Sequence, residues 1–275
     1  MYTNARPIAA AEGEKCIQIK IRIYLDILAI EEMYTNNSLQ RSGQRKNVYK
    51  GVVYMPHMIG IMGRLGAGKT TIATVMTHLY KFEVEKIGGE IELFGNFDLT
   101  GATLMQEPED WYKVADAHGS ICVWDEAQRS FNSRNAMSFH NKLANDVLTF
   151  CRKMASIQIF VTPSIKRLDI VIRDLLEVLI IVRQMGGKGI RFDYYDFTAD
   201  AFGPYGQFLH SRFLPAAKVQ QIYKLNLFDS HSFISGFPLP KTERAAEKFM
   251  QELEERHDAA RKKKRDELKA KGVLV

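Results

Sequence analysis

The sequence predicts an α/β domain with a mainly parallel central sheet and helices on both faces. Two observations point to this class. Between about residues 50 and 200, apolar runs of strand length alternate with stretches of helical spacing. Four of the apolar runs carry no charge, as expected of buried parallel strands that helices cover on both faces. A chain of 275 residues is long enough for one large domain with an appendage.

The expected elements follow one another in the order that this class requires. Glycine follows the first apolar run, and the glycine-rich residues 186–189 connect the last run to a hairpin partner. The expected strands are Met58–Met62, Glu90–Phe94, Ile121–Trp124, Ile157–Val161, Val178–Val182 and Ile190–Phe197. The expected helices are Thr70–Tyr80, Met137–Met154 and Ile165–Leu176.

Composition divides the chain into four segments. Residues 1–50 show no clean period and are expected to be an N-terminal extension, and residues 51–200 are the core. Residues 201–240 are rich in Phe, Gly and Pro and are expected to be an irregular extension. Residues 241–275 form a charged helical tail.

Most of the excess positive charge lies in the tail. The chain has a net charge of +6, and Arg261–Lys271 contains seven basic residues against two acidic ones. The run Arg261–Arg265 suits DNA, a membrane surface or an acidic partner. The alternative is a solvated terminal helix with Glu–Lys pairs.

Cysteine usage and hydropathy indicate the compartment. Cys16, Cys122 and Cys151 are an odd number at unrelated spacings, which gives neither a disulfide framework nor a zinc pattern. No run approaches the ~18 consecutive apolar residues of a membrane span. Residues 1–11 lack the apolar centre of a signal peptide. The sequence therefore predicts a cytoplasmic protein without a transmembrane segment.

The strongest motif is Gly63-x-x-x-x-Gly68-Lys69-Thr70, which matches the phosphate-binding loop, or P-loop, at every fixed position. It follows an expected buried strand and opens an expected helix, so its backbone N–H groups and the helix dipole are available to phosphate oxygens. We expect Lys69 to reach the β- and γ-phosphates of ATP, and the Thr70 hydroxyl to bind Mg²⁺. The alternative is a glycine-rich turn without a ligand. The expected nucleotide-binding residues of the loop are Gly63, Arg64, Leu65, Gly66, Ala67, Gly68, Lys69, Thr70 and Thr71.

Two adjacent carboxylates, Asp125 and Glu126, end the apolar strand Ile121–Trp124. An Asp at this place can hold Mg²⁺, and the following Glu can orient or deprotonate the attacking water. The pair places the chain among P-loop NTPases of the ASCE, RecA-like type, with Ile157–Val161 as the strand inserted between the two motif strands. The alternative is that the carboxylates only cap the next helix.

A polar residue, Thr162, ends the expected inserted strand. Two interpretations remain open for it and for Ser164. Either side chain can sense the γ-phosphate between the two motif strands, or it can form the N-cap of the helix that follows.

Several segments resemble the zonular occludens toxin (Zot)-like family, within the FtsK–HerA group of DNA-translocating and virus-packaging ATPases. The resemblance covers about residues 57 to 200, and its more specific elements are Asn-Phe-Asp-Leu, Asp-Glu-Ala-Gln-Arg and Thr-x-Ser-x-x-x-Leu-Asp-x-x-x-Arg. The segments are Gly63–Thr71, Gly95–Leu99, Trp124–Arg134, Cys151–Lys153, Phe160–Pro163 and Leu168–Arg173.

The resemblance implies an ATPase from a virus or prophage that acts in virion assembly or genome packaging. It implies a homo-oligomeric ring, usually a hexamer, with active sites between subunits, and ATP and Mg²⁺ as ligands. The implied partners are double-stranded or single-stranded DNA and capsid or membrane proteins, in the host cytoplasm or on the virion. Two features depart from the family pattern: Pro163 stands where the family has Gln, and the membrane segment of filamentous-phage members is missing.

Arginine and lysine residues in the matched segments have two expected roles. Arg173 and Arg152, ahead of Arg134, are candidates for the arginine that stabilises the transition-state charge, often from a neighbouring subunit. Arg129, Arg134 and Lys142 are candidates for contacts with DNA phosphates. The alternative for each is a solvated surface charge.

Three hypotheses of function follow. The first is an ATP-driven DNA translocase that moves a viral genome into or out of a particle. The second is a filamentous-phage-type morphogenesis ATPase that acts on coat protein and membrane. The third is a nucleotide-binding assembly factor without translocation.

Overall fold

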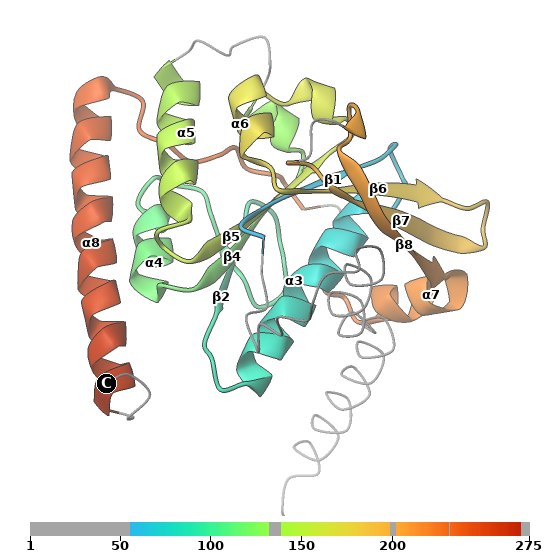
Figure 1. Ribbon diagram of the computed structural model, residues 1–275, viewed down its shortest axis with the longest axis horizontal. Helices are drawn as coiled ribbons and strands as arrows, with labels where there is room; N and C mark the ends of the chain where they lie inside the picture. Colours follow the sequence, from blue (N-terminus) through green and yellow to red (C-terminus); the bar gives the residue numbers. More distant parts are fainter. Residues whose placement is uncertain (1–55, 132–138, 199–201, 231, 271–275) are drawn as a thin grey trace, which may run out of the picture. The chain divides into compact units, whose positions relative to one another are not determined.

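The computed structural model describes residues 56–131, 139–198, 202–230 and 232–270. In this part of the chain, eight strands form one sheet with the order β3-β2-β4-β5-β1-β6-β7-β8 (Figure 1). The strands are β1 (Met58–Met62), β2 (Glu92–Gly95), β3 (Thr103–Leu104), β4 (Ser120–Trp124), β5 (Ser156–Thr162), β6 (Val178–Gln184), β7 (Gly189–Asp196) and β8 (Gln207–Pro215). The expected N-terminal extension, residues 1–50, lies outside the described residues.

Strands β1 to β6 are parallel to one another, whereas β7 is antiparallel to both of its neighbours, β6 and β8. Strand β5 lies between β1 and β4, in register with both (Met62 beside Thr162, Trp124 beside Phe160). The expected inserted strand is therefore confirmed, as is the hairpin of β6 with β7.

Side chains alternate between the two faces of the sheet because successive residues of a strand point in opposite directions. Met58, Cys122, Trp124 and Phe160 face a core that includes buried residues of α4 (Asp110–Ala117), α5 (Phe139–Cys151), α6 (Ile170–Leu175) and α8 (Glu243–Ala270). The residues between them face α3 (Lys69–Lys86), which contacts β1, β4 and β5. Helices thus cover both faces, as the sequence predicts (Figure 1).

Residues 201–240 differ from the expected irregular extension. They contain β8 and α7 (Ala216–Lys224), and β8 extends the central sheet by pairing with β7. Their composition gives little sign of this because β8 is an edge strand in which only Leu214 is buried, so no alternation of apolar and polar residues marks it. The sheet of the core therefore continues to Pro215.

After α7 the chain returns to the half of the sheet that contains β2 and β4. Phe228 forms an isolated bridge with Leu99, and Ser235 and Phe237 lie against the ends of β2 and β4 through hydrogen bonds described below. We call residues 232–240 the strap, of which the structure describes all. The strap leads into α8, which packs on α4 and α5 (Figure 1).

Two further expectations are refined. The tail is helical, but α8 is no free appendage, because Ala246, Phe249, Leu253 and His257 are buried. The helix expected over Ile165–Leu176 is two pieces, a 3-10 turn at Ile165–Arg167 and then α6, separated by Leu168 in an extended conformation.

Candidate nucleotide-binding and catalytic site

The phosphate loop connects β1 to the first turn of α3, as expected. Gly68 is in the left-handed region (φ 89°), and a Cβ on it would lie 2.4 Å from the Ile190 side chain. At Gly63, a Cβ would lie 2.3 Å from the Val182 carbonyl oxygen. Only glycine fits at both positions, so β6 and β7 pack directly against the loop.

Lys69, in the first turn of α3, extends along the loop. Its Nζ donates a hydrogen bond to the Arg64 carbonyl oxygen (3.1 Å). Burial lowers the pKa of Lys69, while the carboxylates of Asp125 and Glu126 act in the opposite direction. The loop lysine and the acidic pair therefore share one electrostatic environment.

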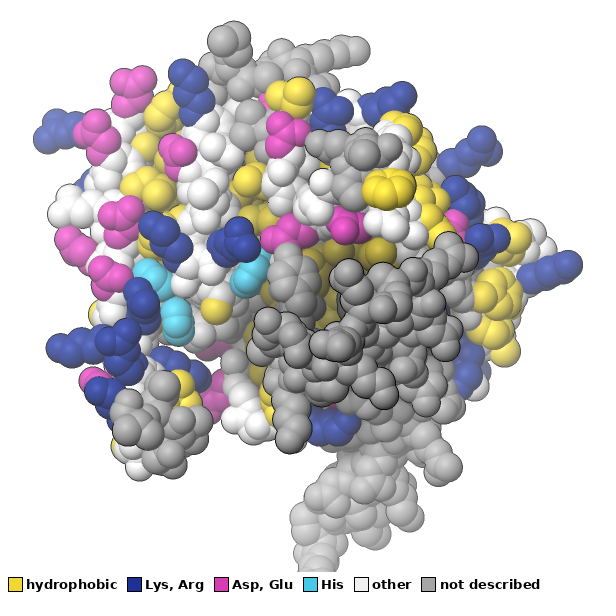
Figure 2. Space-filling model, in the orientation of Figure 1, with side chains coloured by type: hydrophobic (Ala, Val, Ile, Leu, Met, Phe, Trp, Pro, Cys, Tyr) yellow, Lys and Arg dark blue, Asp and Glu magenta, His cyan; other side chains and the backbone are white. Residues whose placement is uncertain are grey.

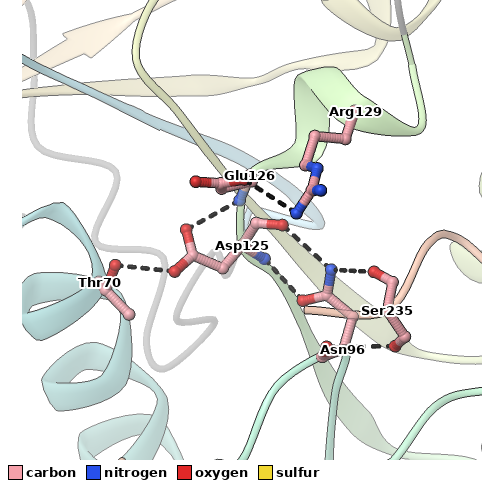
Figure 3. Close-up of polar contacts among 6 residues, drawn as sticks. All are labelled: Thr70, Asn96, Asp125, Glu126, Arg129 and Ser235. Carbon is pink, nitrogen blue, oxygen red and sulfur yellow. Dashed lines mark hydrogen bonds and ion pairs between the residues drawn. The ribbon is translucent and has the colours of Figure 1, made fainter. Parts of the chain in front are cut away.

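Thr70 and Asp125 meet across the site. The Thr70 hydroxyl donates to the Asp125 carboxylate (2.9 Å), although the two residues belong to α3 and to the turn after β4 (Figure 3). Burial raises the pKa of Asp125; the Thr70 hydroxyl, the Glu126 N–H and Lys69 oppose this rise.

These two oxygen ligands suit Mg²⁺. The ion prefers hard oxygen donors, and it commonly binds one or two protein groups together with waters and substrate phosphates. Thr70 and Asp125 supply such a pair. A cation between them would also offset the burial of the Asp125 carboxylate. The donor set therefore fits the expected metal.

Glu126 follows in an unusual backbone conformation. Its φ is 47° and its ψ is 42°, in the left-handed region that non-glycine residues rarely adopt. Its side chain makes no capping hydrogen bond to the 3-10 turn Ala127–Arg129 that follows. The carboxylate instead forms a half-exposed ion pair with Arg129 (3.3 Å; Figure 3). Glu126 therefore begins this turn without a side-chain cap, and its catalytic role remains a prediction.

Asn96 and Ser235 belong to the same cluster and were not predicted from the sequence. Asn96 is the residue after β2, and its side-chain amide pairs with the backbone of Asp125. Ser235, in the strap, bonds in turn to Asn96 (Figure 3). The sequence element Asn-Phe-Asp-Leu was the only signal that Asn96 has a role.

Tyr223 is a second unpredicted neighbour of the loop. The Thr71 hydroxyl lies 3.4 Å from the Tyr223 hydroxyl, which links α7 to the first turn of α3. Nothing near Tyr223 in the sequence marks this contact, because α7 follows the loop by about 150 residues.

Thr162 is at the expected tip of β5, beside Met62 at the end of the loop strand. It is fully buried, and its hydroxyl bonds to the Ser164 backbone, donating to the carbonyl (3.1 Å) and accepting from the N–H (3.4 Å). Ser164 begins the 3-10 turn without a side-chain capping bond. The position fits a sensor, and the sensor role remains a prediction.

Of the two leading arginine candidates, Arg152 lies away from the loop of its own chain. Arg152 is exposed and precedes β5, at the amino edge of the sheet, whereas the loop is at the carboxyl edge. The seven residues of β5 separate these edges by roughly 20 Å. Arg173 is on α6, half-buried, with its Nε buried and unpaired among the described residues. Arg152 would have to act on the site of a neighbouring subunit, and the catalytic role of either arginine remains a prediction.

Two of the three residues expected to contact DNA, Arg129 and Lys142, lie within the described part of the chain. Arg129 is held by Glu126, Lys142 is exposed on α5, and Arg134 lies outside the described residues. Their contact with DNA stays a prediction.

A cavity of about 680 Å³ adjoins the loop on the side of β6. Its lining includes Arg64, Leu65, Pro163, Arg183 and Tyr205. The volume is in the range of small-molecule sites. The loop therefore borders a nucleotide-sized hollow as well as the acidic pair.

Comparisons with known proteins agree with the expected resemblance. A model of the family "Zonular occludens toxin (Zot)" matches residues 81–211, which include the acidic pair and begin after the phosphate loop. No curated protein matches the chain.

Three solved structures illustrate the distant likeness. The N-terminal domain of zonular occludens toxin from Neisseria meningitidis has 18% identity and a TM-score of 0.43, over 68% of this chain and 96% of that one. The genome packaging NTPase B204 from Sulfolobus turreted icosahedral virus 2, in complex with ATP-gammaS, has 10% identity and a TM-score of 0.38, over 57% and 96%. The KaiC-like protein PH0186 from Pyrococcus horikoshii OT3 has 11% identity and a TM-score of 0.34, over 58% and 82%.

The strand order, the loop and the Thr70–Asp125–Glu126 arrangement together carry the groups that an ATP-hydrolysing P-loop enzyme uses. No helix within the described ranges is long and apolar enough to cross a membrane. The chain is a P-loop NTPase of the ASCE type, and its likeness to the Zot family is confirmed over residues 81–211.

Proposed function

We propose that this chain is an ATP-driven DNA translocase or packaging ATPase of a virus or prophage. The observation that carries ATP hydrolysis is the hydrogen bond between Thr70 and Asp125, with Glu126 as the next residue. It brings the metal-binding hydroxyl, the metal-binding carboxylate and a candidate base to the mouth of one phosphate loop.

Different groups of the chain bind the phosphates of ATP and activate the attacking water. The backbone N–H groups of residues 63–70 and the Lys69 ammonium bind the β- and γ-phosphate oxygens. Glu126 orients a water molecule for in-line attack on the γ-phosphorus and accepts its proton, while the bond to the β–γ bridging oxygen breaks and ADP leaves. When Mg²⁺ is bound by Thr70 and Asp125, it neutralises charge that develops on the phosphates.

Movement of DNA rests on the resemblance and on charge. The Zot-like segment includes the catalytic turn, and the FtsK–HerA group to which the resemblance points consists of DNA-translocating and packaging motors. Helix α8 adds the cations of Arg261–Arg265, which suit a phosphate backbone without reading its sequence. In this proposal a ring of subunits, with an arginine supplied across each contact, couples hydrolysis to DNA.

The test is the ATPase rate at several protein concentrations, with no DNA, double-stranded DNA or single-stranded DNA. We expect stimulation by DNA and a rate per subunit that rises with protein concentration, because neighbouring subunits complete the site. A rate independent of both would reject the translocase. No ATP turnover under any condition would reject the enzyme.

A second function, morphogenesis on coat protein and membrane, is favoured by one surface. Strand β8 exposes Phe208, Leu209 and Phe213, and Figure 2 shows hydrophobic and basic side chains intermixed at the right edge, where Figure 1 places β6 to β8. Clustered exposed apolar groups of this kind mark protein or membrane contacts. Flotation with anionic liposomes, lost in a Phe208→Ser/Phe213→Ser variant, would favour this function over the first.

A further inference from the structure

Asn96 is bound to the Asp125 backbone on both sides of that residue's Cα. Its Oδ1 accepts a hydrogen bond from the Asp125 N–H (2.8 Å), and its Nδ2 donates to the Asp125 carbonyl oxygen (3.0 Å). Asn96 is only 3% exposed, and β2 and β4 are paired up to this point, with Gly95 beside Val123. The side chain thus continues the strand pairing into the turn that carries the acidic pair.

The second Nδ2 hydrogen of Asn96 forms a hydrogen bond with the strap. Nδ2 also donates to the Ser235 carbonyl oxygen (2.9 Å), while the Ser235 N–H donates to the Asn96 carbonyl oxygen (2.8 Å). A flipped amide would place donors against the Asp125 N–H and an acceptor against two carbonyls. One orientation of the side chain therefore satisfies all of these groups, and the amide is held rigidly.

Glu126 is the residue that most needs such support. Its left-handed conformation costs about 1–2 kcal/mol relative to the right-handed one for an L-residue. Such conformations persist where the surroundings fix the chain on either side. Asn96 fixes the peptide groups of Asp125 before it, and the Arg129 N–H donates to the Glu126 carbonyl oxygen after it (2.8 Å).

We infer that Asn96 is a positioning residue for hydrolysis, which holds the Asp125–Glu126 turn so that the first carboxylate faces Thr70 and the second faces the attacking water. It acts through Asp125 and Glu126 and touches neither substrate nor metal. This inference rests on the proposed ATP hydrolysis.

The test compares Asn96→Asp and Asn96→Ala with the wild type. The Asp variant keeps the shape and one acceptor but turns the two Nδ2 donations into contacts between oxygens. For both variants we expect kcat to fall about 10- to 100-fold and the Mg²⁺ concentration for half-maximal rate to rise, as for groups that orient metal ligands. Binding of a fluorescent ATP analogue without Mg²⁺ should stay within about twofold, because the phosphate loop is unchanged.

Ser120→Ala is the matched control. Ser120 begins β4, at the opposite end from Asp125, and its hydroxyl donates to Ser156 in a buried bond between strands (2.6 Å). Its loss should lower the melting temperature and leave kcat and the Mg²⁺ dependence unchanged. If Asn96→Ala matches Ser120→Ala in all three readouts, Asn96 is only structural and the inference is rejected.

Amide hydrogen exchange keeps the inference separable from the proposed function. The Asp125 N–H should exchange faster in Asn96→Ala than in the wild type, whether or not the wild type hydrolyses ATP. Absent wild-type turnover defeats the proposed function alone. Unchanged exchange at Asp125 and Glu126 in Asn96→Ala would reject only the role of Asn96. The same conclusion would follow if Asn96→Ala lost ATP binding to the same extent as it lost rate.

Discussion

The two halves of the sheet, on either side of the loop strand β1, differ in what they present. On one side every residue of β4 and β5 is buried, and the acidic turn at their ends is fixed by Asn96 and the strap. On the other side β6, β7 and β8 form an antiparallel ribbon whose edge strand exposes Phe208, Leu209 and Phe213. The half that holds the candidate catalytic carboxylates is closed, whereas the half beyond the loop offers apolar and basic surface.

This difference separates two tasks within one sheet. Catalytic groups must be held within a fraction of an ångström, so they are placed on buried strands with saturated hydrogen bonds. Contacts with other molecules need accessible side chains, and the ribbon supplies these next to Gly63 and Gly68, which pack on Val182 and Ile190. A partner bound to the ribbon would therefore act on the phosphate loop through Val182 and Ile190, without contacting the turn that carries Asp125 and Glu126.

The largest expected effect is on catalysis in the closed half. Glu126→Gln should lower kcat about 10²- to 10⁴-fold, the usual contribution of a general base, while ATP remains bound. Single-turnover rates and retention of radiolabelled ATP would measure this. Arg129→Ala is the control, because it removes only the exposed ion pair and should change kcat no more than severalfold. Unchanged turnover in Glu126→Gln would assign the base elsewhere.

The next largest effect is on the free energy of unfolding, which should fall more for substitutions in the closed half than for substitutions on the ribbon. Phe237, in the strap, packs on Trp111, Trp124 and Phe131 with ring centroids 4.5–5.0 Å apart and is 4% exposed. Phe237→Ala should lower the free energy of unfolding by about 3–5 kcal/mol. Phe213→Ala, on the ribbon, should change it by no more than about 0.5 kcal/mol, because this ring is 51% exposed. Equal losses in urea titrations would show that the ribbon is as well packed as the closed half.

Removing the apolar ribbon surface should separate basal activity from assembly. Phe208→Ser/Phe213→Ser should keep the basal ATPase rate within about twofold, since neither ring lies in the closed half, but should reduce self-association or partner binding. Sedimentation velocity and the concentration dependence of the rate are the measurements. If the double variant associates as the wild type does, the apolar surface of the ribbon has no role in assembly.

The smallest effect concerns pH and the ribbon histidine His210, which stacks on Tyr194 (4.3 Å). Burial, with help from Arg212, lowers the pKa of His210 to about 4. The unfolded chain takes up this proton near pH 6.5 and the native state does not, so stability is lost as pH falls from about 6.5 toward 4. His210→Phe should flatten the melting-temperature profile in this window, whereas His140→Phe, on α5, tests a histidine of the closed half. Identical slopes in wild type and His210→Phe would contradict the assignment.

Local signals made the phosphate loop and the order of the buried strands predictable. Glycine, lysine and threonine at fixed spacing define the loop, and uncharged, mostly apolar runs define β1, β4, β5 and β6. The position of β5 between the motif strands followed from the adjacent Asp125 and Glu126.

The rest depends on contacts that local sequence does not encode. Asn96 and Ser235 are 139 residues apart, and on the strap side the Asn96 amide bonds to a backbone carbonyl that any residue could supply. Strand β8 and helix α7 bury one residue each, Leu214 and Ile222, so no periodicity reveals them. Arg152 and Arg173 were chosen from a motif, and the fold places at least Arg152 at the far edge of the sheet from its own loop.

The position of the strap in the sequence also determines when, during synthesis, the contacts of the Asp125–Glu126 turn can form. The phosphate loop, Asn96 and Asp125 all leave the ribosome before residues 232–240, yet the strap supplies the Ser235 contacts of Asn96 and the Phe237 ring against Trp124. A nascent chain can therefore form the loop and the sheet while its acidic turn still lacks half of its support. Competence for hydrolysis would arrive only after residues 232–240 have been made and lie against β2 and β4.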